Sequence, residues 1–365
     1  MSTFALGLDV DGDGYHPAAW RRASHSPAEL LTPRRVRTVV AAAENAGFTF
    51  ALFDDSPVAG APGPDTQGRI DAVTRAAFVA GSTSAIGLVP VASTTYSEPF
   101  HVATQIASLD HASRGRAGWL AARTTDRAAG PAFGVPARTD EQIDADQRDA
   151  VTVARALWDS WDDDAVIRDS TTGRYLDRDR IRHVGFVGEN LSVTGPSIVP
   201  RPPQGQVVVF GRDGELPADA ADVVVVSGDS VDRLRAAARN ARLAGSGRVV
   251  AEVFVALDLD RPGHPTETAS QRIDSLDAHT GFVLDPGAFS ATGDAATVVG
   301  ILTELASFLD GAILRPLVLD EEIRVLTRLV LPALLGRRVL RRPLVGATLR
   351  DHLGLARPVN LIGAS

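Results

Sequence analysis

The sequence contains no cysteine and no lysine. Without cysteine the protein has no disulfide bonds, no thiolate metal sites and no cysteine nucleophile. Without lysine it has no lysine-based covalent catalysis, and all 37 basic residues are arginines.

The charge balance and the lack of long apolar runs limit the partners. The net charge is −8, and a general role on nucleic acid or a membrane surface would require a basic excess that neutralises phosphates. No apolar run reaches the length of a bilayer span, and the opening Phe4–Leu8 is too short and uncharged for a signal peptide. We therefore expect a cytoplasmic protein with neither nucleic-acid nor membrane partners.

Several common cofactor and metal motifs are also absent. The acidic run 9–14 resembles a calcium loop, but it follows a predicted strand and has Trp20 where the loop would need its final glutamate. The sequence has no glycine-rich dinucleotide fingerprint, phosphate loop or zinc-binding histidine pair. It therefore predicts no metal ion.

The best-defined stretch of the chain lies between residues 85 and 118. Residues 86–92 are apolar and rich in β-formers, which is typical of a strand buried on both faces. The hydroxyl cluster Ser93–Thr95 follows, and Ser97–Pro99 is a helix start with a capping serine, an early acid and a proline in the first turn. We expect that helix to end near Asp110 and a glycine turn to lead into the next strand, forming a βαβ unit.

The same alternation recurs along the chain. Predicted strands lie at residues 4–9, 48–53, 86–92, near 119, 207–210, 223–226, 249–256 and 312–314. Helical segments separate most of them, and a chain of 365 residues fits one such domain. The sequence thus predicts an α/β fold, a (β/α)8 TIM barrel in a single domain 1–365, with insertions after strands 4 and 6. We expect residues 162–205 to form an insertion or lid within it.

Short motifs in the best-defined stretch resemble those of a known family. These motifs are Ser93–Tyr96, Pro99–Ala103, Ser108–His111 and Gly115–Trp119, and further matches fall at 14–21, 157–161, 195–205 and 347–358. In this order and at these separations they resemble the bacterial luciferase-like flavin-dependent monooxygenases. The branch concerned contains nitrilotriacetate, dibenzothiophene-sulfone and long-chain alkane monooxygenases.

The resemblance implies an activity and a set of site residues. A separate flavin reductase would supply reduced FMN, which with O2 would oxygenate a small organic substrate in a homodimeric enzyme. Asp55 would lie beside the flavin, Ser93 and Thr94 would hydrogen-bond the ring edge, and His16 would act as acid or base in the substrate pocket. Each residue has a structural alternative: a helix cap or turn for Asp55, loop capping for Ser93 and Thr94, and a surface loop for His16.

Several positions depart from the family pattern. Leu120 stands where the family has asparagine next to the flavin, and Asp144 aligns with a tyrosine expected at the phosphate. The loop at 210–216 is shorter than the family's phosphate-cradling segment and begins with Gly211 and Arg212.

Three functions remain open from the sequence. Arg123 and Arg212 are able to grip a phosphate in a bidentate manner, which favours an FMN-dependent monooxygenase with Gly211 and Arg212 at the cofactor. The altered positions favour a barrel without flavin that acts as a ligand-binding or partner subunit. A deazaflavin cofactor, F420, is the third alternative, because related families use it.

Overall fold

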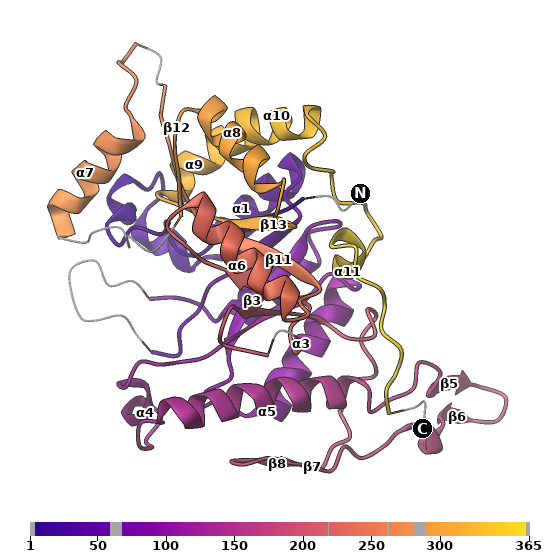
Figure 1. Ribbon diagram of the computed structural model, residues 1–365. Coiled ribbons are helices and arrows are strands. Elements are labelled where there is room, and N and C mark those ends of the chain that lie inside the picture. The colour runs from indigo at the N-terminus through magenta and orange to yellow at the C-terminus, as the bar shows by residue number, and fades with distance from the viewer. Residues whose placement is uncertain (1–3, 59–67, 218, 261–262, 281–288, 363–365) are drawn as a thin grey trace.

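The computed structural model describes residues 4–58, 68–217, 219–260, 263–280 and 289–362. Parallel strands form a barrel (Figure 1), and its eight members are β1 (Ala5–Asp9), β2 (Phe50–Phe53), β3 (Gly87–Ser93), β4 (Gly118–Ala122), β9 (Val208–Arg212), β10 (Val223–Val226), β11 (Arg248–Leu257) and β13 (Gly311–Pro316). The ring closes because β1 pairs with both β2 and β13, while β10 pairs with both β9 and β11. The predicted (β/α)8 barrel is confirmed.

Helices surround the strands (Figure 1). They are α1 (Pro33–Ala46), α2 (Ala72–Ala80), α3 (Pro99–Ser113), α4 (Ala129–Ala132), α5 (Asp140–Trp158), α6 (Val231–Leu243), α7 (Ala269–Thr280), α8 (Ala295–Leu305), α9 (Leu319–Val325), α10 (Leu331–Gly336) and α11 (Leu349–His352), with short 3-10 turns η1 (Ala19–Arg22), η2 (Pro27–Leu31) and η3 (Arg178–Arg180). A π-helical turn, Leu326–Val330, joins α9 to α10. The sequence predicts the position of α3 well, because Pro99 opens it and the apolar residues Val102, Ile106 and Leu109 are buried against the barrel.

The second irregular stretch, 258–280, differs from the prediction in one respect. It follows β11, the seventh barrel strand, which corresponds to the predicted strand 249–256, whereas the second insertion was expected after strand 6. An additional strand, β12 (Ser290–Gly293), pairs with Phe254–Leu257, the part of β11 that extends beyond β10. The excursion therefore lengthens one side of the barrel.

The insertion 162–205 forms two small hairpins. β5 (Val166–Asp169) pairs with β6 (Arg174–Leu176), and β7 (Phe186–Val187) pairs with β8 (Ser192–Val193). Figure 1 shows them beside α5 and the C-terminal end of the chain. Asp163 in this segment pairs with Arg357 near the C-terminus. The segment lines none of the cavity described below, and its role as a lid stays a prediction.

The barrel interior is apolar, and one end of it is sealed. Side chains from neighbouring strands form a buried cluster together with Leu349 of α11. Its strand residues include Phe50, Val89, Leu120, Phe210 and Ile313. A methyl group added at Gly87 or Gly118 would lie only 2.6 or 3.0 Å from Leu349. The two glycines therefore leave the space that Leu349 fills at the N-terminal end of the barrel, and polar groups collect at the opposite mouth.

No helix in the described parts of the chain is long and apolar enough to cross a membrane.

Candidate functional site

The inward layer at the C-terminal mouth of the barrel is polar. Side chains alternate along a strand, so a residue two positions beyond an inward core residue also points inward. Counting two residues beyond the interior cluster gives Asp54, Ser93, Thr124, Arg212, Glu252 and Arg315, with Asp9 in the same layer on β1. In a TIM barrel this face carries the functional groups.

Ion pairs connect the charged members of this layer. Arg315 Nε lies 3.0 Å from Asp9 Oδ2 and its Nη2 donates to Asp54, while Arg212 Nη2 lies 3.3 Å from Glu252 Oε1. Burial raises the pKa of Asp9 to about 7, with Arg315 opposing the rise and Asp54 reinforcing it. Asp9 is therefore able to exchange a proton near neutral pH.

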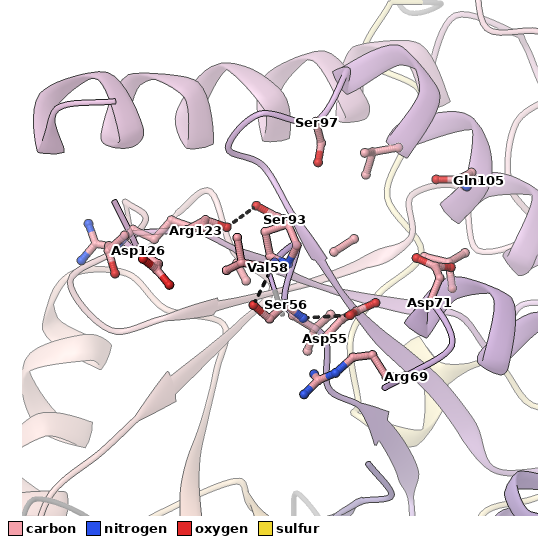
Figure 2. Close-up of a pocket in the computed structure, with 18 residues that line it drawn as sticks. Asp55, Ser56, Val58, Arg69, Asp71, Ser93, Ser97, Gln105, Arg123 and Asp126 are labelled. Carbon is pink, nitrogen blue, oxygen red and sulfur yellow. Dashed lines mark hydrogen bonds between the residues drawn. The ribbon is translucent and has the colours of Figure 1, made fainter. Parts of the chain in front are cut away.

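Beside this layer lies a cavity of about 550 Å³ (Figure 2). It opens between the loops that follow β2, β3 and β4 and the N-terminal parts of α2 and α3, and its lining includes Asp55, Arg69, Asp71, Val73, Val91, Ser93, Ser97, Val102, Gln105, Arg123, Thr124 and Asp126. Figure 2 shows Arg123 with Asp126 at one side and Arg69 with Asp55 at the other. The volume is in the range of small-molecule and cofactor sites.

Two hydroxyl groups and one carboxyl group form the polar centre of the cavity. Ser93 Oγ and Thr124 Oγ1 lie 2.8 Å apart, at the ends of β3 and β4. Asp55 accepts hydrogen bonds from the backbone N–H groups of Ser56 (2.8 Å) and Ala72 (2.7 Å). Partial burial raises the pKa of Asp55, although these hydrogen bonds oppose the rise. Asp55 thus lies in the cavity and also tethers the start of α2.

The other cofactor residues predicted from the sequence lie elsewhere. The Thr94 hydroxyl is buried and donates to Ala122 O (3.1 Å), Leu120 is in the barrel interior, and Gly211 packs outward against Leu216. Arg212 is paired with Glu252 in the mouth. Of the predicted cofactor residues, the cavity brings together only Asp55 and Ser93.

His16 is likewise outside the cavity lining. Its ring is buried, Nδ1 accepts from the Ala18 N–H (3.0 Å), and Nε2 lies 3.0 Å from Asp277 Oδ1 on α7. Because Nδ1 accepts, Nε2 carries the proton and donates it to Asp277. A catalytic role for His16 stays a prediction, and it would require this hydrogen bond to be exchanged.

Several cavity residues were not predicted from the sequence. Thr124 is a candidate from its position alone, because it follows strand β4 as Ser93 follows β3 and polar residues at these strand ends meet, but no cofactor role was assigned to it. Asp71 caps α2, accepting from Thr74 N–H (2.7 Å), which an Asp before an apolar helix often signals. Arg69 and Gln105 carry no comparable sequence signal.

The cavity suits a flavin ring better than a phosphate. Ser93 Oγ donates to Thr95 O (3.1 Å) and accepts from the Thr95 N–H (3.2 Å), so Thr124 Oγ1 keeps most of the hydrogen-bonding capacity that the pair offers to the polar edge of an isoalloxazine ring. The two arginines of the cavity already lie beside carboxylates. Arg123 Nη1 donates to Asp144 (2.6 Å), and Arg123 Nε lies 3.5 Å from Glu215. Arg69 lies 3.5 Å from Asp11. Asp144 therefore holds the arginine that a phosphate would need.

Comparisons with known proteins identify the family. The sequence model described as luciferase-like monooxygenase matches residues 15–276, well over half of the chain. The protein therefore belongs to the luciferase-like monooxygenase family, in agreement with the resemblance of its motifs.

Individual relatives extend over nearly the whole chain. N-acetyl-S-(2-succino)cysteine monooxygenase of Bacillus subtilis is 28% identical, covering 97% of this chain and 97% of its own length. Nitrilotriacetate monooxygenase component A of Aminobacter aminovorans is 28% identical, covering 98% and 97%. One of the subunits of pristinamycin IIA synthase from Streptomyces pristinaespiralis is 39% identical over 52% of this chain and 61% of its own.

Solved structures share the fold. A long-chain alkane monooxygenase superposes with a TM-score of 0.84 at 18% identity, covering 100% of this chain and 99% of its own. The EDTA monooxygenase of Chelativorans gives 0.81 at 21% identity, covering 97% and 99%. At these identities the superpositions establish the common barrel fold.

Proposed function

We propose that this protein is a flavin-dependent monooxygenase that uses reduced flavin and O2 to oxidise a small organic substrate. The observation that carries the proposal is the Ser93–Thr124 hydroxyl pair beside Asp55, in a cavity at the mouth of a barrel of this family. A relative named as component A of a monooxygenase supports a separate flavin reductase as partner. A homodimer remains a prediction from the family resemblance.

The residues of the cavity have distinct roles in this proposal. A bound reduced flavin supplies the electrons that activate O2. Ser93 Oγ and Thr124 Oγ1 hydrogen-bond the polar edge of the ring. The apolar walls, Val73, Val91 and Val102, exclude water from the reacting face.

The group that we assign to proton exchange is Asp9, which, like His16, does not line the cavity but lies in the mouth layer beside it. Asp9 lies in the mouth layer with a pKa of about 7, which suits a general acid or base near neutrality. Arg315 Nε fixes Asp9 Oδ2 in place, and the backbone N–H of Asp11 donates to Asp9 Oδ1 (3.0 Å). Both nitrogens of His16, in contrast, are hydrogen-bonded away from the cavity.

Anaerobic titration with reduced riboflavin and reduced FMN tests the proposal by calorimetry. We expect at least one flavin to bind with a micromolar dissociation constant. Ser93→Ala combined with Thr124→Val removes both hydroxyls and should weaken that binding about tenfold or more, because each hydrogen bond contributes about 1 kcal/mol. Ser108→Ala, an exposed serine on α3, is the matched control and should leave the affinity unchanged.

A flavin-free partner subunit is the second candidate. The carboxylates around Arg123 favour it, and one relative is named as a subunit of a synthase. If neither flavin binds in either redox state up to about millimolar concentration, the monooxygenase proposal fails and this candidate takes its place.

A further inference from the structure

The arginines of the cavity are compensated by the protein's own carboxylates. Arg123 contacts Asp144 and Glu215, and Arg69 contacts Asp11. These carboxylates neutralise part of the charge of each arginine before any phosphate arrives, although Arg123 Nε itself has no hydrogen-bond partner among the described residues. No other arginine lines this cavity in the described part of the chain.

The helix ends at the cavity are occupied in the same way. Helix N-termini commonly bind phosphate through free backbone N–H groups. At α2 the first N–H groups donate to Asp55 and Asp71, and at α3 the N–H groups of Phe100 and His101 donate to Glu98 (3.0 and 2.6 Å). Carboxylates thus hold the donors that would otherwise bind an anion.

The electrostatic balance of the cavity is negative. Its lining has three aspartates, Asp55, Asp71 and Asp126, against two arginines. The partners of those arginines add three more carboxylates, and among the residues that the structure describes only Asp11 of these three has a second cation, Arg75, at 2.6 Å. A doubly charged phosphate placed here would be repelled.

We infer that this cavity selects an uncharged flavin, riboflavin, over its phosphate ester FMN. The inference rests on the proposed function, since it concerns which flavin the same site takes. The hydroxyl pair binds the ring that both molecules share, and the surrounding carboxylates discriminate against the group that only FMN carries. F420, which also carries a phosphate, is disfavoured for the same reason.

The first test compares the two flavins directly, reduced and oxidised, at low and high salt. Riboflavin should bind at least tenfold more tightly than FMN, and the FMN affinity should rise with salt, because ions screen the repulsion. The riboflavin affinity should not change with salt.

Three outcomes are distinguishable. Tighter binding of riboflavin supports the inference. Equal or tighter binding of FMN overturns it and leaves the flavin-dependent function standing. Binding of neither flavin overturns both proposals together.

A second test releases Arg123 from its carboxylates. The double variant Asp144→Asn and Glu215→Gln should raise FMN affinity at least tenfold while leaving riboflavin affinity unchanged. Asp179→Asn, an exposed aspartate in the insertion, removes a negative charge elsewhere and is the control. An equal gain for both flavins, or no gain for FMN in a variant that melts like the wild type, would contradict the role assigned to these carboxylates.

Discussion

At the scale of single residues, Asp9 links the mouth of the barrel to the pH response of the fold. Burial raises its pKa from 3.8 to about 7, so the folded protein holds the proton more tightly than the unfolded chain does. The stability that follows from this difference is complete below about pH 4 and is lost as the pH rises through about 7.

Replacing Asp9 by asparagine should remove this pH dependence. Asparagine does not titrate, so between pH 5 and pH 8 the stability of Asp9→Asn relative to the wild type should rise by on the order of 3 kcal/mol. Urea unfolding at several pH values measures the difference. Asp140→Asn, at an exposed carboxyl on α5, is the control, and parallel stability curves for Asp9→Asn and wild type would refute the assignment.

Individual residues of the cavity differ in how far their place could be predicted from the sequence. Ser93 and Asp55, which the family resemblance places beside a flavin, both line the cavity, as polar residues at the C-terminal ends of barrel strands commonly do; their roles at a cofactor stay predictions. Thr94 and Gly211 do not line the cavity, because neighbouring residues of a strand face opposite sides and a shift of one residue reverses a side chain; their roles at a cofactor likewise stay predictions. The carboxylates that compensate Arg123 come from α5 and the loop after β9, a pairing between distant segments that no local pattern reveals.

At the scale of elements, a buried ion pair joins α7 to α9. Arg272 and Glu322 are both fully buried, and Arg272 also donates to Leu257 O (2.6 Å) and contacts Glu321 (2.7 Å). The pair ties the excursion after β11 to the helix after β13. Neither helix alone could hold such a charge without a partner.

Removing one member of this pair should be strongly destabilising. Arg272→Met leaves Glu322 as an uncompensated buried charge and should cost about 3–5 kcal/mol in the free energy of unfolding. Adding Glu322→Gln should restore part of that loss. Arg180→Met breaks the exposed pair with Asp164 and should cost less than about 1 kcal/mol; comparable losses for the two arginines would contradict the role of burial.

Apolar strands and helices could be predicted from the sequence, whereas polar and exposed ones could not. The barrel strands were found because their cores are apolar, whereas β5 is mostly exposed and β12, Ser290–Gly293, gains its strand geometry from pairing with β11. The amphipathic pattern of residues 146–161 predicts a helix there, whereas α5 begins at Asp140, because a capping box of Thr139 and Gln142 opens it ahead of its apolar face.

At the scale of the whole molecule, Leu349 closes the barrel. Its side chain is fully buried among the interior residues of the strands, above Gly87 and Gly118. Leu349→Ala should therefore cost about 2–5 kcal/mol, because it opens a cavity that the rigid strands do not refill. Chemical denaturation measures this loss. Leu344→Ala, at an exposed leucine, should change stability by no more than about 0.5 kcal/mol, and a similar effect at both sites would show that the barrel end is not sealed as described.

The pairing of β1 with β13 has a consequence for synthesis on the ribosome. β1 cannot pair with β13 until the ribosome has added about 300 further residues. The N-terminal end of the barrel stays open until Leu349 has been synthesised. Such distant pairing delays folding. A nascent chain that stops before residue 311 has a sheet with open edges, which invite pairing between chains. Translation must therefore pass β13 and Leu349 before the barrel of the growing chain is closed and protected from aggregation.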